Sequence, residues 1–296
     1  MPSVPVSIVI PTYRRPDMLI GALDSVAAQT VTGAEVIVVD DAADARTASV
    51  VADHPLPATC LAQDHRGAAA ARNTGLARAS ADCVAFLDDD DRWRDGFLPR
   101  MLGLMRDRPE LLMAYSDFIS TDPSGRPLRG HRKRPHAGRV TPELFASIFI
   151  HTSCVVARRT ALLAAGGFDE TLPCSEDYDL WLKLSLRGPF GLIDEPLVQR
   201  TVHPNSLSRT DLPDKLRCKA EMLERFYTSL GGRDAVDPRR ARRRLAKVFY
   251  SAAKAHVKAR RAGDAVALLR RSRHYGGAWH KRLALALRAR LQGGAA

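Results

Sequence analysis

Four consecutive aspartates, residues 88–91, form the acidic run of this chain and are its clearest chemical signal. Adjacent carboxylates repel one another, and a divalent cation turns that repulsion into attraction. In an extended segment, side chains two residues apart point the same way, so Asp88 and Asp90 are expected to face one site. Hard oxygen ligands of this kind suit Mg²⁺ or Mn²⁺ held jointly with phosphates. The structural alternative is that one aspartate caps the helix that follows.

A second acidic pair, Glu176 and Asp177, stands at the start of a predicted helix over residues 177–186. Such a pair can simply provide favourable charge at a helix N-terminus. It also follows a glycine-rich segment, residues 166–170, which is expected to turn the chain back toward the acidic run. The pair can therefore be either a helix-terminal charge or part of a site near the acidic run.

The elements around these residues alternate between strand and helix over the first hundred residues. Predicted strands cover residues 6–10, 35–39, 58–62 and 83–87, and predicted helices cover residues 17–29 and 67–79. This alternation indicates βαβ crossovers and a mostly parallel sheet. Asp40 and Asp41, like the acidic run, come directly after a strand, at the sheet edge where ligands bind in open α/β folds.

Further strands are predicted over residues 113–119 and 153–157, with a basic loop at 131–136. From about residue 214 the pattern becomes helical and basic, which places a domain boundary near 205–215. The predicted domains are residues 1–210 and 211–296. From residue 211 onward the chain has 22 Lys and Arg against 7 Asp and Glu, so its formal net charge of +12 arises entirely in this tail.

The composition is that of an ordinary globular protein, with 45% hydrophobic and 26% charged residues among 296. No apolar stretch approaches the roughly 18 residues that span a membrane, and the N-terminus has no secretory signal pattern. These features predict a cytoplasmic protein. The five cysteines are widely spaced without a C-x-x-C pair, which indicates neither a disulfide framework nor a zinc site.

An ordered series of short motifs carries a family resemblance. In chain order they are IPTYRR (10–15), VDD (39–41), ARNTG (71–75), FLDDDD (86–91), GGFDE (166–170), EDYDLW (176–181), RTVH (200–203) and SLS (206–208). Together, over roughly residues 4–210, they resemble the inverting family 2 glycosyltransferases, which use nucleotide-diphosphate sugars. The resemblance implies the GT-A type of α/β fold, a mostly parallel, Rossmann-like sheet flanked by helices, with the basic helical region appended to it.

The resemblance implies that Thr12, Tyr13 and Asp41 hold the base and ribose, with Asp41 accepting a hydrogen bond from a uracil-type N–H. The other residues that it assigns to donor binding are Pro11, Arg72, Asn73, Asp89, Glu176 and His203. Arg72 and Asn73 would support the phosphates, and His203 would lie near the pyrophosphate or metal. Taken alone, Tyr13 would be a packing aromatic and His203 a loop histidine. The chain departs from the family where D-D-x-S is replaced by residues 40–43, DDAA, which removes a hydroxyl that steadies this turn.

The resemblance further implies that Asp88, Asp90 and Asp91 bind Mn²⁺ or Mg²⁺ at the two phosphates and that Asp177 is the general base. The expected reaction moves a sugar, favouring a UDP-linked donor, onto a hydroxyl with inversion, in polysaccharide or glycoconjugate synthesis. It requires Asp177 and the acidic run to flank one bound donor.

The predicted partners are a nucleotide-sugar donor and a saccharide or lipid-linked acceptor. The basic tail suits docking on the inner face of an anionic membrane, although a solvated helical face is the simpler interpretation. No nucleic-acid-binding motif is present. Two alternatives remain open: a sugar-phosphate nucleotidyltransferase, which would typically have a glycine-rich loop where Thr12 and Tyr13 stand, and a non-catalytic binding protein.

Overall fold

Strand and helix alternate along the first hundred residues of the computed structural model, which describes residues 5–128, 135–203, 212–276 and 285. Their bounds are β1 (Val6–Thr12), α1 (Pro16–Ala27), β2 (Glu35–Asp40), α2 (Ala45–Asp53), β3 (Thr59–Ala62), α3 (Ala68–Arg78) and β4 (Cys83–Phe86). β1 pairs in parallel with β2 and β4, and β2 pairs in parallel with β3. This half of the sheet is the one that the sequence predicts.

Later segments extend the same sheet to eight strands in the order β3-β2-β1-β4-β7-β6-β8-β5. The added elements are β5 (Arg92–Trp93), α4 (Phe97–Asp107), β6 (Met113–Thr121), η1 (Thr152–Cys154), β7 (Val155–Arg158), α6 (Arg159–Ala164) and β8 (Phe190–Thr201). β6 and β8 are parallel, whereas β7 is antiparallel to β4 and β6, and β5 is antiparallel to β8. The α/β fold is confirmed. Most of the predicted loop at 131–136 lies outside the described residues.

Pro11 lies inside β1, although the sequence predicts that the strand ends before it. Val9 accepts a hydrogen bond from Leu87, beyond β4, and Thr12 accepts one from Asp41, beyond β2. Because alternate residues of a central strand bond to opposite neighbours, Pro11 turns its nitrogen to the β4 side. The β1–β4 pairing stops at Val9, so the missing N–H of Pro11 breaks no ladder bond.

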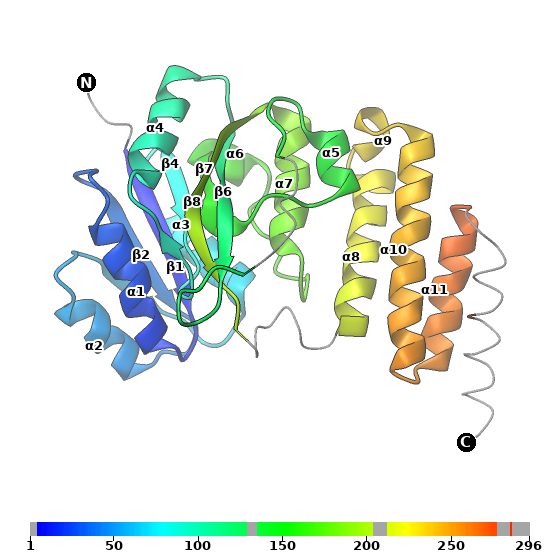
Figure 1. The fold of residues 1–296 in the computed structure, drawn as a ribbon, viewed down its shortest axis with the longest axis horizontal. Coiled ribbons are helices and arrows are strands. Elements are labelled where there is room, and N and C mark those ends of the chain that lie inside the picture. The colour runs from blue at the N-terminus through cyan, green and yellow to red at the C-terminus, as the bar shows by residue number, and fades with distance from the viewer. Residues whose placement is uncertain (1–4, 129–134, 204–211, 277–284, 286–296) are drawn as a thin grey trace. The chain divides into compact units, whose positions relative to one another are not determined.

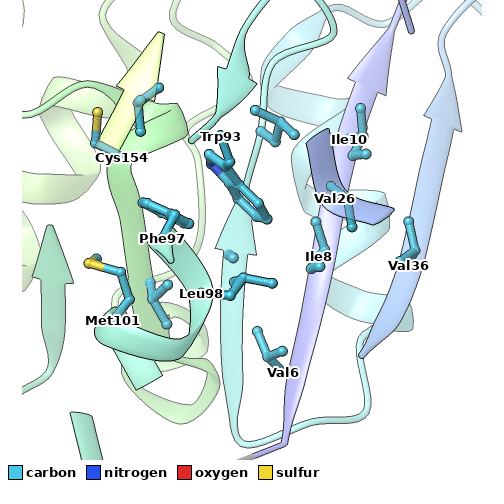
Figure 2. Close-up of a cluster of buried hydrophobic side chains, with 14 of the residues drawn as sticks. Val6, Ile8, Ile10, Val26, Val36, Trp93, Phe97, Leu98, Met101 and Cys154 are labelled. Carbon is cyan, nitrogen blue, oxygen red and sulfur yellow. The ribbon is translucent and has the colours of Figure 1, made fainter. Parts of the chain in front are cut away.

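The two faces of β1 are covered by different helices. Figure 2 shows the side chains of Val6, Ile8 and Ile10 on the face where the core also contains Trp93 and residues of α1 and α4. On the other face, Val9 is fully buried and lies against Gly75 of α3. This close contact fixes α3, and with it Arg72 and Asn73, beside the end of β1.

The remaining helices form a separate compact unit. They are α5 (Thr141–Ala146), α7 (Glu176–Arg187), α8 (Leu212–Ser229), α9 (Gly232–Ala235), α10 (Pro238–Lys258) and α11 (Ala262–His274). α10 packs between α8 and α11 (Figure 1), and Tyr178 of α7 donates to the carbonyl of Leu144 in α5. In the described part of the chain, no helix is both long enough and apolar enough to span a bilayer.

The two units do not follow a single cut in the sequence. The sheet unit comprises Met1–Val140, Phe149–Glu170 and Arg187–His203, and the helical unit comprises Thr141–Ile148, Thr171–Leu186 and Pro204–Ala296. Two segments from before residue 205 therefore group with the C-terminal helices. The contiguous domains 1–210 and 211–296 stay a prediction.

Candidate active site

The four aspartates of the acidic run follow β4 and differ sharply in accessibility. The side chains of Asp88 and Asp90 are 23% and 22% exposed, whereas those of Asp89 and Asp91 are 0% and 2% exposed. The backbone N–H of Asp91 donates to the carbonyl of Asp88 and closes the turn. The run is therefore a turn rather than the extended segment that the sequence suggested, and it leaves Asp88 and Asp90 as the accessible carboxylates; that both face one site stays a prediction.

Asp89 and Asp91 hold the turn in place from inside the sheet unit. Asp89 accepts a hydrogen bond from Thr12 Oγ1 at 2.7 Å, and burial, with repulsion from its neighbours, raises its pKa to about 7. Asp91 accepts from His151 Nε2 and Ser153 Oγ, both at 2.6 Å, and from the backbone N–H of Thr201 at 3.1 Å. Both carboxylates are thus engaged by groups far away in the sequence.

Two arginines place positive charge behind the acidic run. Arg15 spans Asp89 and Asp90, with N–O distances of 2.7 and 3.0 Å. Arg72, which is nearly buried in α3, contacts Asp88 at 2.7 Å. Burial opposes ionisation of Asp88, but Arg72 and His151 outweigh it and lower its pKa. Asp90 has no such excess of cations, so burial and repulsion from Asp88 and Asp91 raise its pKa.

The donor set of the acidic run fits a divalent cation. Within the described residues, ligand atoms of Asp88, Asp91 and His151 lie within 4.8 Å of one another. Carboxylate oxygens suit hard cations such as Mg²⁺ and Mn²⁺, and imidazole is tolerated by the softer of the two. A cation beside these groups would also offset the repulsion that raises the pKa of Asp90.

Asp41, after β2, is joined to the acidic run through Thr12. Its backbone N–H donates to the Thr12 carbonyl at 2.9 Å, while the Thr12 hydroxyl donates to Asp89. The Asp41 carboxylate accepts from Gln63 Nε2 at 2.7 Å and from the backbone N–H of Arg66 at 2.8 Å. Burial opposes its ionisation, but these hydrogen bonds outweigh the burial and lower its pKa.

The turn that follows β2, residues 40–44, is closed by the side chain of Asp40. The Asp40 carboxylate accepts hydrogen bonds from the backbone N–H groups of Ala42 and Asp44, at 3.0 and 2.6 Å. Ala43 adopts a left-handed conformation with φ 49°. The Asp40 carboxylate therefore closes this turn without a hydroxyl at residue 43.

Asn73 fixes the glycine-rich turn that the sequence singles out. Its amide donates to the Phe168 carbonyl at 2.8 Å and accepts from the Phe168 N–H at 2.9 Å. Glu170 accepts from the same amide at 2.9 Å and from Arg66 at 2.8 Å. Gly167, with φ 66°, packs so closely on Asn73 that a Cβ would lie 2.7 Å from its oxygen. Asn73 thus acts on this turn directly, and its role toward phosphates stays a prediction.

The predicted general base lies in the helical unit, in the first turn of α7. Asp177 is half-buried and accepts a hydrogen bond from the Tyr178 N–H at 2.7 Å, while Ser175 before it has φ 65°. Asp179 is fully buried and pairs with Lys183 and Arg225, at 2.7 and 2.8 Å. Asp179 therefore joins α7 to α8. The roles of Asp177 and its neighbour Glu176 toward a substrate stay predictions.

Further predicted residues surround the acidic run, and some contacts were not foreseen. His203 follows β8 and lies close enough to Asp90 to oppose the rise in the pKa of that carboxyl. Pro11 lies in β1 and has no polar side chain with which to bind a donor. Sequence reasoning assigned no role to Arg15 or His151. Arg15 falls within the IPTYRR motif, which was a usable signal, whereas nothing local distinguishes His151.

The comparisons with known proteins identify the family to which the chain belongs. The model of the glycosyl transferase family 2 matches residues 7–164, which is more than half of the chain. The chain belongs to this family. The family match argues against the nucleotidyltransferase alternative. It shows the class of enzyme and does not identify a particular substrate.

Individual relatives are glycosyltransferases of bacteria. The chain is 37% identical over 166 residues to a pre-mycofactocin glycosyltransferase of Mycobacterium tuberculosis, covering 53% of this chain and 35% of that protein. It is 31% identical over 213 residues to the amylovoran biosynthesis glycosyltransferase AmsB of Erwinia amylovora, covering 67% and 69%. The match thus spans only about a third of the first of these relatives.

Solved structures share the fold at low identity. A structure of S. aureus TarS 1-349 in complex with UDP has a TM-score of 0.62 and 19% identity, covering 83% of this chain and 70% of that one. The mannosyltransferase PcManGT of Pyrobaculum calidifontis, in complex with GDP-Man and Mn²⁺, has a TM-score of 0.57 and 20% identity, covering 97% and 86%. These likenesses support the GT-A fold.

Proposed function

We propose that this protein is an inverting glycosyltransferase that moves a sugar from a nucleotide-diphosphate donor to an acceptor hydroxyl in polysaccharide or glycoconjugate synthesis. The observation that carries the proposal is the pair of accessible carboxylates, Asp88 and Asp90, at the carboxyl end of β4. Thr12 donates to Asp89, between these two residues, and accepts from the Asp41 N–H, so the expected base-binding and phosphate-binding elements follow neighbouring strands at one sheet edge.

The donor would lie along that edge. Tyr13, Asp41 and Thr12 would hold the base and ribose, and Asp88, Asp90 and Asp91 would hold a divalent cation beside the two phosphates. When bound, this cation supplies Lewis-acid stabilisation of the charge on the departing diphosphate. Arg72, through its contact with Asp88, keeps that carboxylate ionised and oriented.

The chemical step would be a single displacement. The Asp177 carboxylate would take the proton of the acceptor hydroxyl while that oxygen forms a bond to the anomeric carbon. The bond from the anomeric carbon to the diphosphate oxygen breaks on the opposite side, so the configuration inverts. We assign this role to Asp177, which lies half-buried in the first turn of α7.

Two measurements test this function. A thermal-shift screen of nucleotide-sugars with and without Mn²⁺ should show stabilisation by one class of donor, strongest for a uridine-linked sugar and dependent on the metal. In the matching turnover assay, Asp177→Asn should lower kcat by about 10²–10⁴ without loss of donor binding. Asp53→Asn, at the exposed end of α2, is the matched control and should have no effect. Near-normal turnover of Asp177→Asn would eliminate Asp177 as the base.

The basic helix α10 supports the predicted contact with an anionic membrane. Its sequence contains no acidic residue, and a row of exposed cations follows one face at helical spacing, namely Arg240, Arg243, Lys247, Lys254 and Lys258. Within the described part of the chain, none of these side chains forms an ion pair with a carboxylate. Anionic lipid would attract such a row. Vesicles containing phosphatidylglycerol should therefore sediment the protein, and the double variant Lys247→Glu, Lys254→Glu should no longer sediment with them. Equal binding to neutral vesicles would contradict the predicted membrane contact.

A further inference from the structure

His65 makes two contacts that a nucleobase would need. Its ring stacks on Tyr13 with a centroid separation of 4.3 Å and an interplanar angle of 29°. Its Nδ1 lies 3.0 Å from Oδ2 of Asp41. A flat heterocycle that stacks on Tyr13 and presents an N–H to Asp41 is also the proposed form of base recognition. The imidazole and the base therefore require the same two partners.

The other donors to Asp41 are anchored, and His65 is not. Arg66 and Gly67 donate through backbone N–H groups at 2.8 Å, in the turn that leads into α3. Gln63 donates at 2.7 Å and is itself held, because its carbonyl oxygen accepts a hydrogen bond from Thr74. The His65 side chain is 64% exposed, and its described hydrogen bond is the one to Asp41. His65 is the donor that can leave with the least disturbance.

The Asp41 carboxylate has no room for a fifth donor. Each of its oxygens already accepts two hydrogen bonds, and the side chain is only 4% exposed. A base N–H must therefore replace one of the four donors rather than add to them. The guanidinium of Arg14 also lies over the Tyr13 ring, 5.2 Å from its centroid, so the ring has neighbours besides the imidazole.

We propose that His65 competes with the donor's nucleobase for the ring of Tyr13 and the carboxylate of Asp41, so that the base binds only when the imidazole swings out. This inference rests on the proposed function and adds a specificity-determining residue to it. A base that carries a ring N–H, such as uracil or guanine, restores the hydrogen bond that His65 gives up. A base that presents no N–H to Asp41 leaves this nearly buried carboxylate short of a donor, which disfavours its binding.

Removing the competitor should strengthen binding of a base-bearing ligand. Breaking the stacked, hydrogen-bonded arrangement of an exposed histidine is a modest penalty, so His65→Ala should lower the Kd for UDP by about three- to tenfold. Inorganic pyrophosphate has no base and should bind the variant and the wild type equally. This difference between ligands separates competition at Asp41 from a general structural effect.

The test is calorimetric titration of UDP and of pyrophosphate, each with Mn²⁺, into the full-length wild type and variants. The matched control is His54→Ala, which removes a histidine at a similar distance, 3.1 Å, from Asp24 on α1, and it should leave both Kd values unchanged. Tighter UDP binding by His65→Ala alone supports the proposal. If the wild type binds UDP but His65→Ala binds it equally or more weakly, His65 is not a competitor and only this inference is overturned. If neither protein binds UDP, GDP is titrated in the same way, and the proposed function falls as well if neither nucleotide binds.

Discussion

Gly75 offers the sharpest test of how the fold positions the site. It lies in α3, and a Cβ added at this position would be 2.3 Å from Cγ1 of Val9 and 3.0 Å from its Cγ2. Carbon atoms in contact prefer separations of about 3.5–4.0 Å. Val9 is fully buried in β1, so it cannot move aside freely. Gly75→Ala must therefore push α3 away from the sheet.

Two opposing effects determine the sign of the result. Alanine is favoured over glycine in a helix interior by about 1 kcal/mol, whereas overpacking a buried contact costs about 1–3 kcal/mol. Because the overlap exceeds an ångström, we expect a cost in the upper part of that range and a net loss of about 1–2 kcal/mol in the free energy of unfolding. The displacement should also weaken the contact between Arg72 and Asp88.

Gly103 in α4 is the matched control. It also lies within an eleven-residue helix, but a Cβ there would meet nothing within 4 Å. Gly103→Ala should stabilise the protein by up to about 1 kcal/mol, from helix propensity alone. Urea unfolding followed by circular dichroism measures both variants. In a Val9→Ala background, Gly75→Ala should no longer destabilise. The reasoning is refuted if Gly75→Ala is as stable as the wild type, or if Val9→Ala leaves its effect unchanged.

Three further predictions follow from the described contacts. Asp90→Asn removes a charge that its neighbours repel, so the melting temperature should not fall. The Mn²⁺ concentration for half-maximal turnover of this variant should rise on the order of tenfold or more. Asp91→Asn weakens charge-assisted hydrogen bonds inside the protein and should instead lower the free energy of unfolding by about 2 kcal/mol in thermal unfolding. The Cys218 thiol donates to the carbonyl of Cys174, and the Cys218 and Ser175 side chains lower the pKa of the Cys174 thiol to about 7. The rate at which iodoacetamide alkylates Cys174, followed by peptide mass spectrometry, should therefore rise with pH through about 7. Cys218→Ala should move that midpoint to higher pH, and an unchanged midpoint would contradict the assignment. Asp179→Ala leaves Lys183 and Arg225, both partly exposed, without their buried carboxylate partner. The free energy of unfolding in urea should fall by about 2–3 kcal/mol. A loss below about 0.5 kcal/mol would show that these ion pairs are not important for stability.

The sequence alone determined the parallel half of the sheet and the place of its acidic residues. β1, β2 and β4 are short β-branched or apolar runs, and α1 and α3 have helical spacing, so each element is encoded by residues close together in the chain. Because parallel strands end at the same edge, the positions of Asp41 and the acidic run followed from the strand assignments. The exposure of Asp88 and Asp90 and the burial of Asp89 and Asp91 depend instead on the turn that the Asp91 N–H closes on the Asp88 carbonyl.

The tertiary structure decided which of these carboxylates are accessible and which groups the buried ones contact. Thr12 is 77 residues from Asp89, and His151 is 60 residues from Asp91, so no local pattern links them. The grouping of α5 and α7 with the C-terminal helices likewise depends on packing between distant segments. Local periodicity encodes an element and the face it presents, whereas the partner of a buried polar group depends on which remote segments the folded chain brings together. The proposed competition between His65 and a base likewise depends on contacts with Tyr13 and Asp41 that arise only in the folded chain.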